Sequence, residues 1–526
     1  MNATLEHSRT LIQALMDPSV YPHPVTKIEV LETHISWVLL TGPFAYKIKK
    51  PVNLGFVDFS TLPLRHHACK EELRLNGRMA PQLYLDIIPI SGTPEAPTLG
   101  DGTAPIEYAV KMRQFPLDAT LDHALPKGKV QNRHLDQLAK DLAKFHGGLL
   151  GAKEPANFGN SEVIKQTITD VFDHFSPEAL PEKEYALLHA LQQWMEQEHA
   201  ARYETFTDRK RQGFVRECHG DLHLANVVLI EDMATPFDGI EFSERLRWID
   251  VISDASFFIM DLRARGRSDF AWRFLNAYLE HSGDYAGISV LRFYEVYRAL
   301  VRTKVARIRL DQSHQSDESS KQLMEEFHRY IHAAQTLAFP SRPSLMIMHG
   351  LSGSGKSTYS QSLLETIGAI RLRSDIERKR MVGLTPNMES TPELKPKLYG
   401  PDTTKRLYIQ LRDAAQRLLA SDYSVIVDAT FLQRQYRDLL RTLAEEVNVP
   451  FFIIDVQAPP ETLRERIVTR AQQHSDASEA DLAVLQQQKR QQEPLGDDEL
   501  RMTYSINSEE SFDPQPIIQA LQARRE

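Results

Sequence analysis

Cysteine is nearly absent from this sequence, which holds only Cys69 and Cys218 in 526 residues. Two thiols are too few for a disulfide framework or a structural zinc site, so we expect both to be packing residues in a reducing compartment. No apolar run approaches the length that spans a bilayer, and the opening MNATLEHSRT lacks the basic start and apolar core of a secretion signal. We therefore expect a cytoplasmic protein with no membrane partner.

Basic charge is not in excess either, because the formal net charge is -9 at pH 7. This argues against broad non-specific affinity for nucleic acid, although a local basic cleft could hide within the average. The hydrophobic content of 42% and the charged content of 25% are those of an ordinary globular protein. The length exceeds what one hydrophobic core usually serves, so two or more domains are expected.

A phosphate-binding pattern stands in the segment SLMIMHGLSGSGKST, residues 344–358, directly after a short apolar run. It matches G-x-x-x-x-G-K-[ST], whose glycines let backbone N–H groups point at phosphate oxygens while the next helix adds its positive end. Lys356 is predicted to reach the β/γ-phosphates, and the Ser357 hydroxyl to hold Mg²⁺. The predicted nucleotide-binding residues of this loop are Gly350, Leu351, Ser352, Gly353, Ser354, Gly355, Lys356, Ser357 and Thr358.

After this loop, short apolar strands alternate with helices, which predicts a parallel sheet wrapped by helices. One strand ends in Asp428, the position of a carboxylate that holds Mg²⁺ through water, and an earlier one ends in Asp375 with Arg378 three residues on. This half resembles the AAA-type, zeta-toxin-like and polynucleotide-kinase-like P-loop kinases. The resemblance implies that Asp375 is the base at an acceptor hydroxyl; a helix-capping role is the alternative.

Arginines after the fourth strand are candidates for a lid that neutralises charge on the transferred phosphoryl group. Arg470 is predicted to be catalytic in this way, with Arg466 as the second lid candidate and a solvated helix face as the alternative. Arg434 and Arg437, which follow Asp428, are predicted to line the acceptor site.

The first half contains a second constellation, CHGDLHLANVVLI, at residues 218–230. It resembles the H-G-D-x-x-x-x-N catalytic loop of the aminoglycoside phosphotransferase and choline kinase group, distant relatives of protein kinases. The resemblance implies that Asp221 accepts or orients the proton of the attacking hydroxyl and that Asn226 holds Mg²⁺. Asp250 and Asp254 match the acidic positions that tie this loop together by capping and hydrogen bonding.

The family's metal-binding aspartate is expected on the next strand, where this sequence reads FDGIEFSE. Glu241 aligns best, and Asp238 lies nearby. A glutamate in place of aspartate keeps the charge and the oxygen ligands but lengthens the reach, which bears on Mg²⁺ geometry.

Upstream, the segment VLLTGPFAYKIKK is predicted to form a hairpin whose second strand carries the nucleotide-binding lysine. Lys47 is the candidate, and Lys49, two residues on and therefore on the same side of a strand, is the alternative. Glu71 and Glu72 lie on the following helix, and the resemblance favours Glu72 as the partner of the lysine. A glycine-rich loop is not evident, and the segment EYAVKMRQF, residues 107–115, is predicted to form the last strand and the hinge that binds adenine.

These observations predict two domains, 1–338 and 339–526, on either side of a proline-containing linker near Pro340. The first has an α+β protein-kinase-like, aminoglycoside-phosphotransferase-like fold, and the second is an α/β P-loop domain with a parallel sheet and flanking helices. The expected activity is ATP- and Mg²⁺-dependent transfer of phosphate to hydroxyl groups, with GTP as an alternative donor and a small molecule as the acceptor. The alternatives are a nucleotide-binding regulatory protein in which one domain is a pseudokinase, and a P-loop kinase that acts on a nucleic acid or nucleotide sugar.

Overall fold

The computed structural model describes residues 3–55, 57–152, 157–175, 180–312, 317–386, 388–391, 394, 398–473 and 478–523. They form two compact units, each discontinuous in sequence. Unit 1 is made of Met1–Leu138, Gly148–Thr167 and Phe206–Phe258; unit 2 is made of Ala139–Gly147, Ile168–Thr205 and Ile259–Glu526. The boundary predicted near Pro340 therefore lies within unit 2, and the division into 1–338 and 339–526 stays a prediction.

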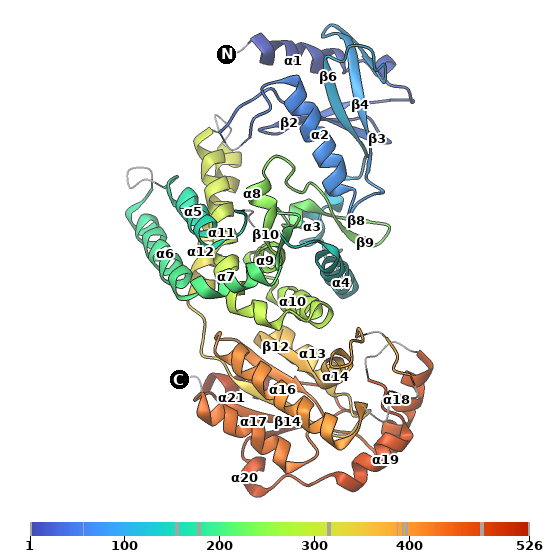
Figure 1. Ribbon diagram of the computed structural model, residues 1–526, viewed down its shortest axis with the longest axis vertical. Helices are drawn as coiled ribbons and strands as arrows, with labels where there is room; N and C mark the ends of the chain where they lie inside the picture. The colour runs from blue at the N-terminus through green and yellow to red at the C-terminus, as the bar shows by residue number, and fades with distance from the viewer. Residues whose placement is uncertain are drawn as a thin grey trace. The chain divides into compact units, whose positions relative to one another are not determined.

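Unit 1 contains a six-stranded antiparallel sheet in the order β1-β2-β3-β6-β4-β5 (Figure 1). Its strands are β1 (Glu29–Glu32), β2 (Ser36–Leu40), β3 (Phe44–Lys49), β4 (Tyr84–Thr93), β5 (Ala96–Leu99) and β6 (Glu107–Arg113). Helix α2 (Leu62–Asn76) follows β3, starts at a Thr61 cap and has proline in its first turn. This antiparallel sheet with one helix between its third and fourth strands is the kinase-like arrangement that the sequence predicts.

Alternation along β3 decides which side chains face α2. Tyr46 and Ile48 pack on one face of the sheet with Leu11 of helix α1 (Ala3–Ala14) and with Leu15, which follows that helix. Ala45 packs on the opposite face with Cys69 of α2. Because side chains of a strand alternate, Lys47 and Lys49 lie on the α2 face.

The rest of unit 1 holds short elements around the HGDLHLAN segment. Strands β7 (Val215–Glu217) and β10 (Trp248–Asp250) pair with each other, as do β8 (Val227–Ile230) and β9 (Met233–Pro236). The short helical elements of unit 1 are α3 (Leu121–Ala124), α8 (Glu244–Arg247), η1 (Pro18–Val20), η2 (Leu117–Ala119) and η4 (Leu224–Asn226). Four helices contain a boundary between the units: α4 (Asn132–Gly148), α5 (Ser161–Phe172), α7 (Tyr203–Arg211) and α9 (Val251–Ala264).

Unit 2 contains a five-stranded parallel sheet in the order β12-β13-β11-β14-β15. Its strands are β11 (Leu345–His349), β12 (Ala369–Arg373), β13 (Ser424–Asp428), β14 (Phe451–Gln457) and β15 (Thr503–Asn507). Every residue of β11 and β13 is buried, as expected of central parallel strands that are covered on both faces. The predicted parallel α/β sheet is therefore confirmed.

Helices account for the remaining described elements of unit 2, most of which are labelled in Figure 1. Those that precede the sheet in sequence are α6 (Glu182–Ala201), α10 (Ser268–Ser282), η5 (Tyr285–Gly287), α11 (Ile288–Gln312) and α12 (Asp317–Ala338). Those that alternate with or follow the strands are α13 (Lys356–Ile367), α14 (Ser374–Arg380), α16 (Pro401–Leu419), α17 (Arg434–Glu446), α18 (Pro460–Gln473), α19 (Leu482–Gln491), α20 (Asp497–Leu500) and α21 (Gln515–Ala523). None of the described helices is long and apolar enough to cross a membrane.

Candidate active sites

The glycine-rich loop of unit 2 connects β11 to α13 in a backbone shape that requires glycine. Gly350 has φ 133°, and a Cβ there would lie 2.4 Å from the carbonyl oxygen of Val456. Gly353 has φ 86°, and a Cβ there would lie 2.8 Å from the carbonyl oxygen of Leu463. Side chains at these two positions would collide with backbone, so this shape of the loop depends on glycine.

Lys356 opens α13 and folds back over the loop, where its Nζ donates hydrogen bonds to the carbonyl oxygens of Gly350 at 2.9 Å and Leu351 at 2.8 Å. Burial lowers the pKa of its ammonium group to about 8, and Asp428 and Asp375 offset only part of that effect. Because burial disfavours the charged form of this ammonium group, an anion that binds beside it would be strongly stabilised.

A cavity of about 240 Å³ brings the predicted residues of this half together. Loop residues, the carboxylates of Asp375 and Asp428, and arginines of α14 and α18 all line it. The site residues predicted from sequence that line it are Ser352, Gly353, Gly355, Lys356, Ser357, Thr358, Asp375, Asp428 and Arg470. Gly350, Leu351 and Ser354 line a second cavity, of about 430 Å³.

Asp428 ends β13 at the sheet edge where the carboxyl ends of parallel strands meet, and its Oδ2 accepts a hydrogen bond from the Ser360 hydroxyl at 3.0 Å. Asp375 follows the end of the neighbouring strand β12. Helix α14 begins at Ser374 with Arg373 as its cap residue, so Asp375 lies within the first turn rather than at the cap. This edge is the usual position of ligands in open α/β sheets.

Arginines bound the cavity on the side of α18. Arg466 donates from Nη1 to the carbonyl oxygen of Ser354 at 3.1 Å and to the Ser508 hydroxyl at 3.0 Å, and Arg470 donates to the carbonyl oxygen of Ala480 at 2.8 Å. Both are partly buried, whereas Arg464 on the same helix is exposed. The two lid candidates are therefore less exposed than residues on an ordinary solvated helix face.

Two aromatic residues of this cavity were missed from the sequence. Tyr399 and Tyr408 line it, and the Arg378 guanidinium lies 4.8 Å from the ring centre of Tyr399. Neither tyrosine has a local signal: Tyr399 precedes α16 and Tyr408 lies on it, and only the packing of α16 against α14 brings them to the site.

Arg434 and Arg437 do not lie where the sequence suggested. Arg437 is fully buried and forms an ion pair with Glu499 at 2.6 Å, and Arg434 pairs with Asp498 at 2.7 Å. Among the described residues that line the cavity, neither arginine is present. Their placement in the acceptor site is wrong, because α17 turns these side chains toward α20 and the segment before it.

The second constellation, in unit 1, is built around two lysines of β3. Lys47 contacts Glu72 of α2 at 2.7 Å and also contacts Asp238. Lys49 contacts the same Glu72 at 2.5 Å and also contacts Glu241. The expected pairing of a strand lysine with Glu72 is present, while Glu71 instead pairs with Arg74 at 2.7 Å.

Burial and charge compete in this cluster. Burial disfavours the charged form of Glu72, but Lys47 and Lys49 more than offset it and lower its pKa to about 2. Burial also disfavours the charged form of Lys47, yet the surrounding carboxylates of Asp238 and Glu72 hold its pKa well above the ordinary value. Burial raises the pKa of Glu241 despite its contact with Lys49.

Asp221 and Asn226 of the HGDLHLAN segment lie together. Asn226 Nδ2 donates to Asp221 Oδ2 at 2.9 Å and to its backbone carbonyl oxygen at 3.0 Å. His223 Nε2 lies 3.4 Å from the same carboxylate, whose side chain is 36% exposed. A carboxylate that is held in place yet reachable suits a group that must meet a substrate.

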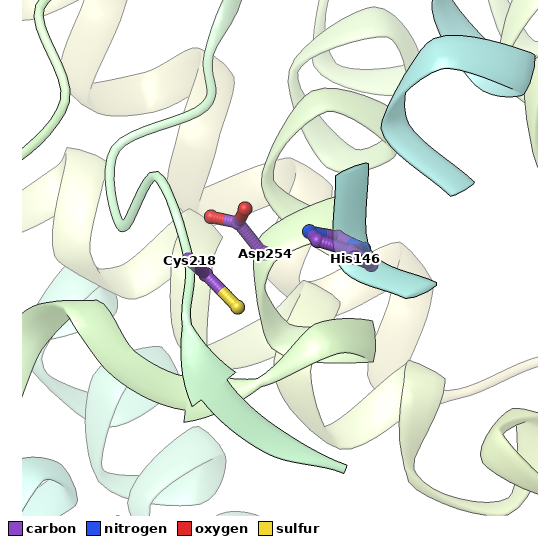
Figure 2. Close-up of side chains that lie close together, drawn as sticks. All are labelled: His146, Cys218 and Asp254. Carbon is purple, nitrogen blue, oxygen red and sulfur yellow. The ribbon is translucent and has the colours of Figure 1, made fainter. Parts of the chain in front are cut away.

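Acidic residues tie this segment together, as predicted. Asp254 accepts hydrogen bonds from the backbone N–H groups of His219 at 3.1 Å and Gly220 at 2.8 Å, and Figure 2 shows its carboxylate near the buried Cys218. Asp250 accepts hydrogen bonds from Arg209 at 2.6 and 2.8 Å. Both aspartates therefore have the structural role expected of them.

The two acidic residues considered as the metal ligand differ in exposure. The side chain of Glu241 is 4% exposed and engaged with Lys49, whereas that of Asp238 is 42% exposed. Asp238 also adopts φ 59°, a left-handed conformation that is uncommon for a residue with a side chain.

Comparisons with known proteins match the P-loop segment by itself and, separately, most of the chain. Residues 345–495 match the family described as "AAA domain". The chain is 30% identical over 468 residues to "Uncharacterized protein Rv2004c" of Mycobacterium tuberculosis and, equally, to "Uncharacterized protein Mb2027c" of Mycobacterium bovis; each alignment covers 88% of this chain and 91% of the relative.

Solved structures with some likeness include an amicoumacin kinase in complex with AMP-PNP, Ca²⁺ and Ami, at 11% identity and a TM-score of 0.39, covering 64% of this chain and 96% of that one. A choline/ethanolamine kinase family protein from Mesorhizobium loti has 15% identity and a TM-score of 0.37, covering 62% and 98%. A gluconokinase from Sinorhizobium meliloti has 22% identity and a TM-score of 0.24, covering 35% and 93%.

Proposed function

The chain belongs to the family that includes Rv2004c of Mycobacterium tuberculosis, and we propose that it is an ATP- and Mg²⁺-dependent phosphotransferase with two nucleotide sites, one in each unit. The kinase-like fold and the P-loop domain support phosphotransferase activity in general. The observation that carries the proposal is the single cavity lined by Lys356, Ser357 and Asp428 on the donor side and by Asp375 and Arg378 on the acceptor side.

The donor half of the cavity suits the β- and γ-phosphates of ATP. Lys356, whose buried charge has a lowered pKa, gains oxygen partners there in place of its own loop carbonyl groups. The Ser357 hydroxyl and the Asp428 carboxylate are hard oxygen donors of the kind that Mg²⁺ prefers, and they would hold the ion. When bound, Mg²⁺ neutralises charge on the phosphate oxygens.

The acceptor half suits a hydroxyl group. Asp375 would accept its proton, and Arg378 would orient the acceptor or its own anionic group. Arg466 and Arg470 are charges fixed at the rim of the same cavity, where they would stabilise the transferred phosphoryl group. We propose a small-molecule alcohol as the acceptor; the cavity volume of about 240 Å³ is consistent with one small molecule and a phosphate group.

The unit 1 site suits a second phosphoryl transfer. Lys47, oriented by Glu72, would bind the α/β-phosphates, and Asp221 would act on the acceptor hydroxyl. Asn226 would be one Mg²⁺ ligand. For the other, exposure favours Asp238 over Glu241, because the Glu241 carboxylate is buried against Lys49.

Burial of Glu241 also supports a second candidate function, in which unit 1 binds nucleotide as a switch without transferring phosphate. Isothermal titration with the non-hydrolysable ATP analogue AMP-PNP in Mg²⁺ tests the shared premise. Two equivalents should bind per wild-type chain, and one should remain in Lys356→Ala and one in Lys47→Ala. Wild-type binding of a single equivalent that Lys356→Ala abolishes would leave unit 1 without a nucleotide site.

The two functions then differ in turnover. Full kinase activity predicts that Asp221→Ala removes a distinct labelled product when [γ-³²P]ATP is supplied with a pool of cell metabolites. The switch predicts that Asp221→Ala changes no product. A labelled nucleic acid or nucleotide sugar from either site would replace the small-molecule acceptor with one of those classes, and salt-sensitive binding would accompany the nucleic acid.

A further inference from the structure

Helix α10 runs along β12, the edge strand of the parallel sheet in unit 2. Trp272, Asn276 and Glu280 follow one another at intervals of four residues, so they share one face of the helix. An edge strand presents unpaired backbone N–H and C=O groups. This face of α10 therefore packs against backbone N–H and C=O groups of β12 that need hydrogen-bonding partners.

Asn276 supplies such partners from its side chain. Its Nδ2 donates to the carbonyl oxygen of Ala369 at 2.9 Å, and its Oδ1 accepts from the N–H of Arg371 at 2.7 Å. The side-chain amide thus occupies the place of a neighbouring strand, and it is 1% exposed. This fixes the position of α10 along β12.

Two glycines allow the close approach. A Cβ on Gly368, just before β12, would lie 2.6 Å from Nε1 of Trp272. A Cβ on Gly283, the residue that ends α10, would lie 2.9 Å from Nε of Arg380. Gly368 therefore lets Trp272 pack closely beside the start of β12, while Gly283 leaves room for the side chain of Arg380 on α14.

Glu280 connects this helix to the phosphate site through one arginine. Arg371 donates to Glu280 Oε1 from Nη2 at 2.7 Å and from Nε at 3.1 Å, and both side chains are buried. From its other nitrogen, Nη1, Arg371 donates to the carbonyl oxygen of Ser357 at 3.2 Å and to the Ser360 hydroxyl at 3.1 Å. Ser360 in turn donates to Asp428.

We propose that Glu280 is a positioning residue for the unit 2 site: it fixes Arg371, which holds Ser357 and, through Ser360, Asp428 where both can bind Mg²⁺. This inference rests on the proposed function of that site. It makes metal-dependent nucleotide binding at the P-loop depend on α10, which lies before the predicted domain boundary. Two N–H groups of the Arg371 guanidinium donate to one oxygen of Glu280, and this charged contact sets the plane of Arg371, so a neutral residue at 280 would free it.

The test uses the full chain with a fluorescent ATP analogue, mant-ATP, titrated with and without Mg²⁺. Glu280→Gln should weaken the apparent Mg²⁺ affinity about tenfold, as loss of a residue that orients a metal ligand commonly does, and should leave Mg²⁺-free binding nearly unchanged. Each titration is carried out in a Lys47→Ala background, so that the fluorescence reports the unit 2 site alone.

A matched control exists on the same helix, α10. Arg273 of α10 pairs with Glu365 of α13 at 2.8 Å, and this pair makes none of the described contacts to Ser357, Ser360 or Asp428. Arg273→Gln should therefore leave the Mg²⁺ titration at the wild-type value. Since Glu280 acts through Arg371, the double variant Glu280→Gln/Arg371→Met should match Arg371→Met alone.

The outcomes separate this inference from the proposed function. If Lys356→Ala still binds mant-ATP at the unit 2 site, the proposed function fails. If Lys356→Ala abolishes binding while Glu280→Gln keeps the wild-type Mg²⁺ titration, or loses binding equally with and without Mg²⁺, the positioning role is overturned. Should Glu280→Gln not fold, Arg371→Lys replaces it, because a lysine keeps the ion pair but lacks the fork that reaches Ser357; a wild-type Mg²⁺ titration would then overturn the inference.

Discussion

The burial, pKa and hydrogen bonds of Lys356 indicate the kind of ligand that suits its site. Its ammonium group is buried, has a pKa lowered to about 8, and binds the carbonyl oxygens of its own loop. Phosphate oxygens carry negative charge, so they would favour the charged form of Lys356 more than these carbonyl groups do. They would therefore raise the pKa of Lys356. Under the proposed function, binding of ATP and protonation of Lys356 are therefore linked.

The linkage predicts a pH dependence of affinity at the unit 2 site. Below pH 8 the free protein already carries the charged lysine, so affinity should be highest there; as the pH rises through 8, binding must recruit a proton, and affinity should fall by up to about tenfold per pH unit. Calorimetric titration of Lys47→Ala with AMP-PNP between pH 6.5 and 9.5 measures it. Lys356→Arg, which stays charged, is the control, and a flat profile in the lysine protein would contradict the linkage.

Asp375 should separate chemistry from binding. Because it lines the acceptor side of the cavity, Asp375→Asn is expected to keep AMP-PNP affinity within about threefold and to lower turnover by roughly 10²–10⁴-fold, as loss of a general base does. Steady-state kinetics with the identified acceptor measure both quantities. Equal loss of affinity and turnover would instead assign Asp375 to nucleotide binding.

Glu241 should matter for stability rather than for metal binding. Glu241→Gln removes one carboxylate from the buried contact with Lys49, so we expect a loss of about 3 kcal/mol in the free energy of unfolding. The control is Glu32→Gln, whose partner is Lys50; Glu32 is 56% exposed, and its loss should cost less than about 1 kcal/mol. Urea unfolding of both variants decides, and a Glu241→Gln protein as stable as wild type would return Glu241 to the role of metal ligand.

Elements differ in how far their sequence determines them. The strand–loop–helix from Leu345 to Ile367 is readable because hydrophobic pattern, glycine spacing and phosphate chemistry all lie within one segment. The shared face of Lys47 and Lys49 follows from strand alternation alone. By contrast, the partners of those lysines lie on other elements, and no local pattern indicates that Glu241 meets Lys49.

Helix α10 illustrates the same limit. Trp272, Asn276 and Glu280 form a stripe at four-residue spacing, but the sequence does not indicate that the stripe meets the edge of a sheet formed about ninety residues later. Likewise, Arg434 and Arg437 are residues of a type that often lines acceptor sites. Only the packing of α17 shows that they instead form ion pairs with Asp498 and Glu499. In both cases, contacts between residues far apart in the sequence determine where the side chains lie.

The α10 contact predicts an unusual sensitivity at Gly368. Gly368→Ala places a Cβ against Trp272 and also strains a residue at φ 74°, so it should destabilise the protein by about 2–4 kcal/mol. Gly383→Ala is the matched control, because Gly383 has φ 77° but open space around it, and strain alone should cost about 1–2 kcal/mol. Urea unfolding followed by tryptophan fluorescence measures the difference, and equal effects would contradict close packing of α10.

At the scale of the whole molecule, the proposed function gives the chain two phosphoryl-transfer sites on two different folds. Sequence patterns predicted both fold classes correctly, and they predict one site in each half because each site is centred on a short motif. The compact units, however, do not follow the linker near Pro340: helices from residue 259 onward belong with the P-loop sheet. A boundary predicted from composition shows where the residue content of the chain changes. It does not show which elements share a core.

This predicts different behaviour of two fragments. A fragment that starts at residue 259 keeps α10 over the edge of β12, whereas one that starts at residue 339 exposes that edge and should aggregate. Size-exclusion chromatography of both at equal concentration checks the prediction. A monomeric, soluble 339–526 fragment that melts as high as the longer one would show that α10 is dispensable to the sheet.

The most direct test of the account is transfer of label from [γ-³²P]ATP into acceptors by wild type, Lys356→Ala and Asp221→Ala, with and without a pool of cell metabolites. The account predicts that metabolites stimulate labelled products in wild type and that each substitution removes a different part of them. Binding of nucleotide with no product above background, and no effect of either substitution, would contradict it and leave a nucleotide-binding switch in its place.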